Sequence, residues 1–167
     1  MEDYVWTGYR QGNVYKASQL ADALKEAFED QEVDLVDSKG IQYFNIPASF
    51  DIETSSFTAK DAKGEDVKVA TMYIWQFGFN GTIVYGRTWE EWMDVLQQLV
   101  DYLDLSPYRH LVIYVHNLGY EFQFIRKMFE WDKVFAIKQR RPVYAICEGL
   151  EFRCSLFLSN YALAYIG

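Results

Sequence analysis

The most constraining feature of the chain is a nearly uninterrupted apolar segment, Leu111 to Val115, with the sequence Leu-Val-Ile-Tyr-Val. A segment without polar alternation is typical of a strand that is buried on both faces of a sheet. We expect an amphipathic helix before it, because Thr88 and Glu91 form the S/T-x-x-E pattern of a helix N-terminus and Pro107 stops the helix. A helix that leads into a doubly buried strand predicts a mixed α/β sheet.

An antiparallel meander of about three strands is expected before this helix. Asn80-Gly81 is a strong signal for a two-residue turn between strands over 67–79 and 82–85. A polar hairpin tip over 60–66 joins the first of these strands to a short strand-like segment, 48–53. The later segments that we expect are a helix over 118–129, strands over 134–138, 143–147 and 152–154, and the start of a helix over 156–167.

The expected fold class is therefore α/β, with a mixed sheet built from the antiparallel meander and a buried parallel strand and flanked by helices. Apolar residues between Ser18 and Glu29 recur at helical spacing, so residues 1–40 are expected to form an N-terminal extension with one amphipathic helix. Residues 41–167 are then the main domain. Because the last residues, Ala-Tyr-Ile-Gly, carry no helix cap, we expect this domain to be truncated at its C-terminus.

Net charge limits the classes of function. The chain has 24 Asp and Glu against 16 Lys and Arg, a net charge of −8, which argues against a protein that coats nucleic acid through a basic surface. A phosphate site built on metal ions remains open, because carboxylates that bind divalent cations also make a chain acidic.

Neither a membrane partner nor secretion is expected. Apolar runs cover only a handful of residues, against the ~20 needed to span a bilayer. The first residues, Met-Glu-Asp-Tyr, are acidic where a signal peptide is basic, and two cysteines make no disulfide framework. A cytoplasmic location is the prediction.

A pair of acids in the strand-like segment is the first candidate for chemistry. Asp51 and Glu53 are two residues apart, so both side chains emerge on one face of the strand, while Ile52 points to the other. Two adjacent acids on a largely apolar strand are unfavourable unless a cation lies between them, and a divalent metal ion is the usual one. Taken alone, Asp-x-Glu equally fits a solvated edge strand.

A second candidate group follows the buried strand. Asn117 and Glu121 are four residues apart, which predicts that the amide and the carboxylate share one face of the next helix. Asn117 equally fits a simple helix cap. The two groups can form one site only if their strands are neighbours in the sheet.

These segments resemble a known family. The residues Phe50-Asp-Ile-Glu-Thr54 and His116-Asn-Leu-Gly-Tyr-Glu121 resemble the first and second exonuclease motifs, D-x-E and N-x-x-x-D, of DNA polymerases with a DnaQ-like proofreading domain. The second is most similar to that of the protein-primed family B DNA polymerases of phages and mobile elements. Within Arg153–Leu156, Ser-Leu is similar to the S/T-L motif by which that branch holds single-stranded primer ends. The resemblance covers about residues 44–160.

The resemblance implies an RNase H-like fold and a two-metal 3′→5′ exonuclease that acts on the 3′ end of single-stranded DNA. Asp51 would bind both Mg²⁺ or Mn²⁺ ions, Glu53 would bind one and orient the attacking water, and Glu121 would bind the other. The residues that would hold the 3′ end are Thr54, Asn117, Leu118, Tyr120, Ser155 and Leu156. The implied partners are the remainder of a polymerase chain and a terminal protein primer, in the cytoplasm of a bacterial host.

Two features depart from the family pattern. Glu121 replaces the more usual Asp, which moves the carboxylate by about one bond length and favours a water-mediated metal contact over a direct one. No Tyr-x-x-x-Asp follows Ser155-Leu156, where the third motif is expected, and the branch's primer-binding lysine is missing too. We therefore expect weak or no activity from this chain alone.

Two other functions keep the same fold. One is a non-catalytic nucleic-acid-binding module whose carboxylates are merely solvated or ion-paired. The other is an RNase or a transposase-like strand transferase, against which the Asn117–Tyr120 segment argues because those positions serve unpaired ends. The basic cluster of Lys138, Arg140 and Arg141 is a hypothetical phosphate contact, whereas His110 and His116 are interpreted as structural.

Overall fold

The structure is a computed structural model, which describes residues 13–139 and 141–159. None of the helices in these ranges is long and apolar enough to cross a membrane. The elements in chain order are β1 (Val14–Lys16), η1 (Ala17–Gln19), α1 (Leu20–Leu24), η2 (Lys25–Glu29), β2 (Leu35–Ser38), β3 (Ile41–Phe44), β4 (Ala48–Lys60), β5 (Asp66–Phe79), β6 (Thr82–Gly86), α2 (Trp89–Leu103), β7 (Arg109–Val115), α3 (Leu118–Ile125), β8 (Lys133–Lys138), β9 (Arg141–Cys147), β10 (Leu150–Cys154) and α4 (Ser155–Ser159).

One open sheet organises these elements. Its strand order is β1-β6-β5-β4-β7-β10-β9-β8, and a β2–β3 hairpin joins it at β7. The strands β4, β5 and β6 form the expected antiparallel meander, while β7 pairs in parallel with both β4 and β10. The predicted mixed α/β sheet is confirmed, with β7 as its central apolar strand.

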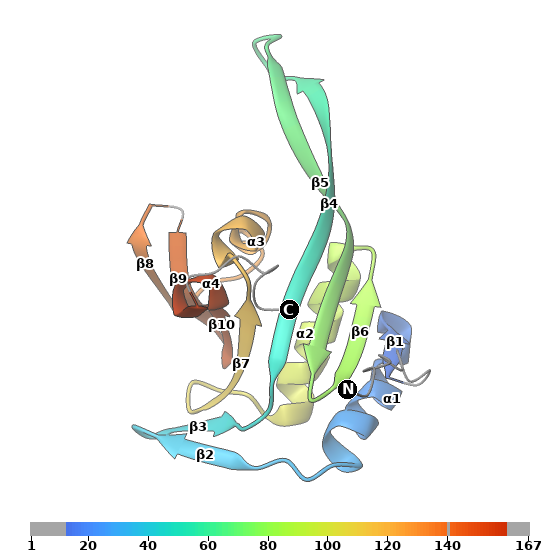
Figure 1. The fold of residues 1–167 in the computed structure, drawn as a ribbon, viewed down its shortest axis with the longest axis vertical. Helices are drawn as coiled ribbons and strands as arrows, with labels where there is room; N and C mark the ends of the chain where they lie inside the picture. Colours follow the sequence, from blue (N-terminus) through green and yellow to red (C-terminus); the bar gives the residue numbers. More distant parts are fainter. Residues whose placement is uncertain (1–12, 140, 160–167) are drawn as a thin grey trace, which may run out of the picture.

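Helix α2 lies against one face of the sheet (Figure 1). Its N-terminus has the predicted capping box, because the Thr88 hydroxyl accepts a hydrogen bond from the backbone N–H of Glu91. Buried residues of α2 meet the aromatic core of the sheet, where Phe50 lies 4.7 Å from Trp92 between ring centroids. The buried stripe of α2 consists of Trp92, Val95, Leu96, Leu99 and Leu103.

Residues 14–40 share the sheet and core with the rest of the chain. β1 pairs in parallel with β6, and the helix predicted over 18–29 forms as η1, α1 and η2 in succession. Leu20 and Leu24 belong to the same apolar core as α2. The polar passage before residue 41 contains β2, which pairs with β3 and was not expected from the sequence.

Two elements differ in length from their predictions. β4 continues past residue 53 to Lys60, so that the outer parts of β4 and β5 project from the body as a two-stranded ribbon (Figure 1). α3 ends at Ile125 rather than 129, because the chain turns to bring Phe129 and Trp131 against the core. The Trp131 indole N–H donates to the Arg126 carbonyl at 2.9 Å and holds this turn. Of the helix expected over 156–167, the described part is α4, and residues 160–167 lie outside the described residues.

Candidate functional site

The first two candidate groups lie on neighbouring strands. On β4, Phe50 and Ile52 are buried in the core, while Asp51 and Glu53 face away from it on the other side of the sheet. Ser49, two residues before Asp51, pairs in parallel with Tyr114 of β7. Because α3 begins shortly after the end of β7, its first turn lies beside the acidic part of β4. The two candidate groups therefore lie on neighbouring strands, as a single site requires.

Two carboxyl groups meet where β4 and α3 come together. Glu121, in the first turn of α3, is only 3% exposed, and its carboxyl group is close enough to that of Asp51 for each to affect the pKa of the other. The Oε2 atom of Glu121 has no hydrogen-bond partner among the described residues. A buried carboxyl oxygen without a partner is unfavourable, so this site favours the binding of a proton or another cation.

Burial changes the protonation of this pair. It raises the pKa of Glu121 to about 8, and repulsion from Asp51 acts in the same direction. Burial is also the main cause that raises the pKa of Asp51, followed by repulsion from Glu53. Two carboxyl groups in contact hold one proton between them. At neutral pH and without a cation, that proton keeps Glu121 neutral.

Glu53 is the third acid of the predicted set. It is close enough to Asp51 to raise the pKa of that residue, but among residues 13–139 and 141–159 no three His, Cys, Asp or Glu side chains form a group that could hold a metal ion. The donor set still fits a hard divalent cation, because such ions prefer carboxylate oxygens and one of these oxygens is buried without a partner. Asp51 and Glu121 would hold the ion, with Glu53 beside them.

Asn117 does not share a helical face with Glu121, so that prediction is wrong. It precedes α3 in the left-handed conformation, with φ 60° and ψ 59°, and its side chain makes no helix-capping hydrogen bond. The chain must turn sharply here, because Leu118 is fully buried and its N–H donates to the Cys154 sulfur at 3.4 Å. Asn117 itself is exposed. Strained backbone of this kind is found disproportionately at functional sites.

Thr54 and Tyr120 are brought together. The Thr54 hydroxyl and the Tyr120 hydroxyl are 2.5 Å apart, which links β4 to α3 beside the carboxyl pair. A register shift between Glu53 and Thr54 sets the position of Thr54 on its strand. The Tyr120 ring also meets Phe124 edge to face at 5.6 Å between centroids. Leu118 is different, because its side chain lies in the core and has no exposed surface to offer.

Ser155 and Leu156 lie at the end of β10. The Ser155 hydroxyl is 3.0 Å from Nδ1 of His116, and Leu156 packs against the core. His116 also acts electrostatically on Asp51 and lowers its pKa slightly against the effect of burial. The sequence predicts only a structural role for His116, and its position directly before Asn117 is the sole sequence feature that points to this link. Lys138 and Arg141 lie at the β8–β9 turn, and Arg140 is outside the described residues.

Comparisons of the chain with protein-family models, with curated proteins and with solved structures found no match.

Proposed function

We propose that the chain carries part of a 3′→5′ exonuclease site of a DNA polymerase, with Asp51, Glu53 and Glu121 as the metal-binding carboxylates. The single observation that carries the proposal is the proximity of Asp51 and Glu121, which come from two separate motifs, with Oε2 of Glu121 lacking a hydrogen-bond partner among the described residues. The reaction is hydrolysis of the 3′-terminal phosphodiester bond of single-stranded DNA, as in the proofreading domains of protein-primed family B DNA polymerases.

The arrangement of strands supports an RNase H-like fold for this domain. An antiparallel meander whose first strand, β4, pairs in parallel with the buried strand β7 is the architecture expected for that fold. The acids also lie where they are needed, on β4 and at the start of the helix that follows β7.

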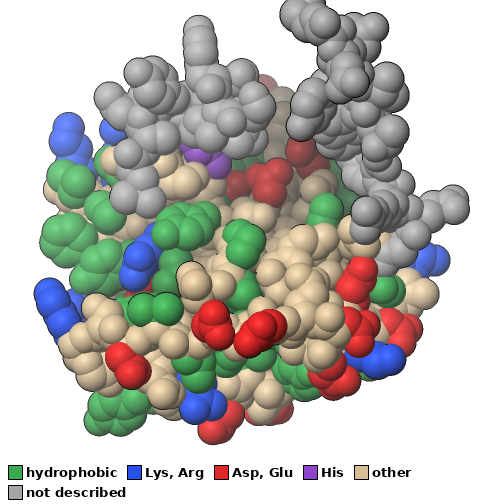
Figure 2. Space-filling model, turned by 60° about the horizontal axis from the view of Figure 1, so that its bottom comes forward, with side chains coloured by type: hydrophobic (Ala, Val, Ile, Leu, Met, Phe, Trp, Pro, Cys, Tyr) green, Lys and Arg blue, Asp and Glu red, His purple; other side chains and the backbone are tan. Residues whose placement is uncertain are grey.

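Mg²⁺ or Mn²⁺ bound at the carboxylates would stabilise the attacking and leaving oxygens of the reaction. Glu121 gives up its proton when a cation replaces it, so occupancy of the site rises with pH. The hydroxyls of Thr54 and Tyr120 and the exposed Asn117 would bind the 3′-terminal nucleotide, and Ser155, held by His116, would contact the same strand. Among the described residues that Figure 2 shows, the Lys and Arg side chains are scattered rather than gathered, so DNA affinity there would depend on the cations.

Metal binding tests the proposal. Isothermal titration with MnCl₂ at pH 8 should show saturable binding to the wild-type chain that is lost in Asp51→Asn. Glu65→Gln, which changes an exposed acid at the tip of the β4–β5 ribbon, is the matched control and should bind like the wild type. Binding that survives Asp51→Asn, or no saturable binding in the wild type, would contradict the proposal.

Nuclease activity gives a second test. The complete polymerase to which this chain would belong should shorten a 5′-labelled single-stranded oligonucleotide from its 3′ end in Mn²⁺. Asp51→Ala combined with Glu53→Ala in that protein should abolish this shortening. An unchanged rate in the double variant would show that the activity comes from elsewhere.

A non-catalytic nucleic-acid-binding module is the second candidate function. The observation in its favour is that the three acids do not close into one metal-binding group within the described residues. It predicts DNA binding without a discrete divalent site, so the Mn²⁺ titration separates it from the exonuclease.

A further inference from the structure

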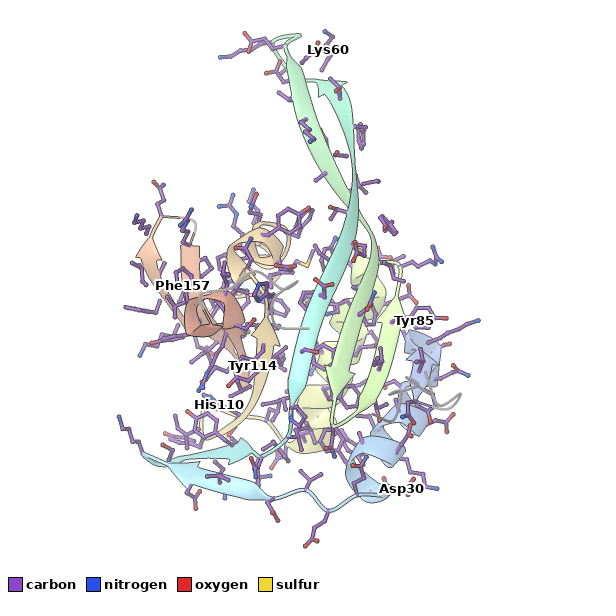
Figure 3. All side chains as sticks on the ribbon, in the orientation of Figure 1. Asp30, Lys60, Tyr85, His110, Tyr114 and Phe157 are labelled. Carbon is purple, nitrogen blue, oxygen red and sulfur yellow. The ribbon has the colours of Figure 1, made fainter. Side chains whose placement is uncertain are left out.

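A second group of titratable side chains lies on the same sheet face as the carboxyl pair, on the other side of β7. His110 of β7 and Glu151 of β10 are 3% and 5% exposed, and Nδ1 of His110 is 2.9 Å from Oε1 of Glu151. The other ring nitrogen, Nε2, is 3.0 Å from the carbonyl oxygen of Pro107. Figure 3 labels His110 and Tyr114 at two levels of β7.

Both ring nitrogens of His110 therefore have a partner within the protein, and Oε1 of Glu151 is one of them. Arg153 donates from Nε to Oε2 of Glu151 at 2.5 Å. Nη2 of Arg153 contacts the same oxygen, while 38% of the Arg153 side chain stays exposed, so part of the guanidinium remains open to a ligand.

Arg153 lines a cavity of about 390 Å³ between the β2–β3 hairpin and the strands β7 and β10. Its guanidinium lies 5.8 Å from the centroid of the Tyr43 ring, and Tyr43 meets His110 edge to face at 5.6 Å. Tyr114 is 37% exposed and forms another wall. The polar side chains of Asn45 and Ser38 also border the cavity.

The cavity adjoins the candidate nuclease site. Tyr114 pairs with Ser49 of β4 on one side and with Arg153 of β10 on the other. Because paired residues of neighbouring strands project on the same face of a sheet, Arg153 lies on the face that carries Asp51. One sheet face therefore presents the carboxyl pair, an exposed tyrosine and an arginine in succession.

We propose that this cavity binds a nucleotide of the single-stranded DNA a few positions upstream of the 3′ end, with Arg153 on a phosphate and Tyr43 or Tyr114 stacked on a base. The inference rests on the proposed function, because the carboxyl pair defines where the 3′ end lies. An arginine fork matches phosphate geometry, and base stacking on aromatic rings tolerates every base. A proofreading site needs such sequence-independent contacts, since any nucleotide can be misincorporated.

Binding of oligonucleotides of different length tests this inference. Fluorescence anisotropy in Ca²⁺ would compare dTMP, (dT)₃ and (dT)₈ for the wild type, Tyr43→Leu and Arg153→Gln. Each variant should weaken (dT)₈ binding at least about fivefold, the lower limit for one stacked base, and change (dT)₃ binding much less. Tyr43→Phe and Arg153→Lys should restore part of the affinity, because they keep the ring and the charge.

Matched controls are Tyr108→Leu and Arg87→Gln, which alter exposed residues that do not line this cavity. Circular dichroism of each variant shows whether it is folded. If Arg153→Gln is unfolded, the conservative variants Tyr43→Phe and Arg153→Lys still test the cavity.

Equal (dT)₈ affinity in all variants, or no DNA binding by the wild type, would overturn the subsite. Tight dTMP binding without a gain for (dT)₈ would assign the cavity to a free nucleotide instead. If Asp51→Asn still abolishes Mn²⁺ binding in these cases, the proposed function stands without the subsite.

Discussion

Glu121 and Glu151 are both buried and lie near opposite sides of β7, yet their surroundings differ in one respect. Both carboxyl oxygens of Glu151 have partners in the protein, His110 at Oε1 and Arg153 at Oε2. Glu121 contacts another carboxyl group, and its Oε2 has no partner among the described residues. Both are less than 6% exposed, at 3% and 5%, so burial alone does not distinguish them.

The difference separates a structural carboxylate from a functional one. A buried charge whose partners come from the protein is compensated in the folded chain and stays ionised. A buried carboxyl group without such partners keeps a proton or binds a cation from solution. The comparison therefore favours Glu121 over Glu151 as a member of the proposed metal-binding set, and this can be tested by changing either residue.

The largest effect on stability is expected from a change of Glu151. Glu151→Gln removes the anion bound by Arg153 and the carboxylate partner of His110, so it should lower the free energy of unfolding by about 3–5 kcal/mol. Urea denaturation followed by tryptophan fluorescence measures this loss. Glu65→Gln at the exposed ribbon tip is the control and should stay within about 0.5 kcal/mol of the wild type. A small loss in Glu151→Gln would remove the contrast between the two glutamates.

Added Mn²⁺ should stabilise the protein only through the pair of Asp51 and Glu121. A ligand that binds the folded state alone stabilises it by about 2.7 kcal/mol at 100 times its dissociation constant. Mn²⁺ should therefore raise the melting temperature of the wild type and of Glu65→Gln, but leave Asp51→Asn unchanged. Thermal melts at pH 8 with and without EDTA make the measurement. Equal shifts in Asp51→Asn would place the bound metal elsewhere.

The uncompensated carboxyl group should make the metal-free protein less stable as the pH rises. The pKa of Glu121 is about 8 in the folded chain, above the ordinary value of 4.5, so the folded state binds more protons between these values. The contribution of Glu121 to stability is greatest below pH 4.5 and falls towards pH 8. Glu121→Gln should flatten this dependence and make the chain more stable than the wild type at pH 8, because the buried amide stays neutral where the buried carboxyl group ionises. Destabilisation like that of Glu151→Gln would show that Glu121 is structural.

The smallest effect is expected at the turn that brings Glu121 into place. Asn117→Gly should leave stability within about 1 kcal/mol of the wild type, since glycine adopts the left-handed conformation without strain, whereas Asn117→Ala should cost about 1 kcal/mol. Both variants remove the side-chain amide, so both should weaken (dT)₃ binding. If only the alanine variant loses affinity, the role of Asn117 is limited to its backbone.

Local patterns predicted much of the fold. The Asn80-Gly81 turn has positive φ at both residues, 50° and 83°, as a two-residue hairpin turn requires. The Thr88–Glu91 capping box and the apolar strand of Leu111–Val115 were also correct. Each depends on residues only a few positions apart, so the chemistry that stabilises it can be read directly from the chain.

Longer-range features were missed or predicted wrongly. Helical spacing placed Asn117 and Glu121 on one face, but burial of Leu118 forced Asn117 into a left-handed turn before the helix. The sequence showed no acidic partner for His110, because Glu151 is 41 residues away and reaches it only through the pairing of β7 with β10.

By itself, the sequence determined the order of strands and helices from residue 48 onward and which residues could carry chemistry, because hydrophobic period, turn residues and caps act over a few positions. Only the tertiary structure decided which buried glutamate has protein partners at both carboxyl oxygens and which does not. That distinction depends on which strands become neighbours, and the free energy of a buried charge is set by the groups within a few ångströms of it in space.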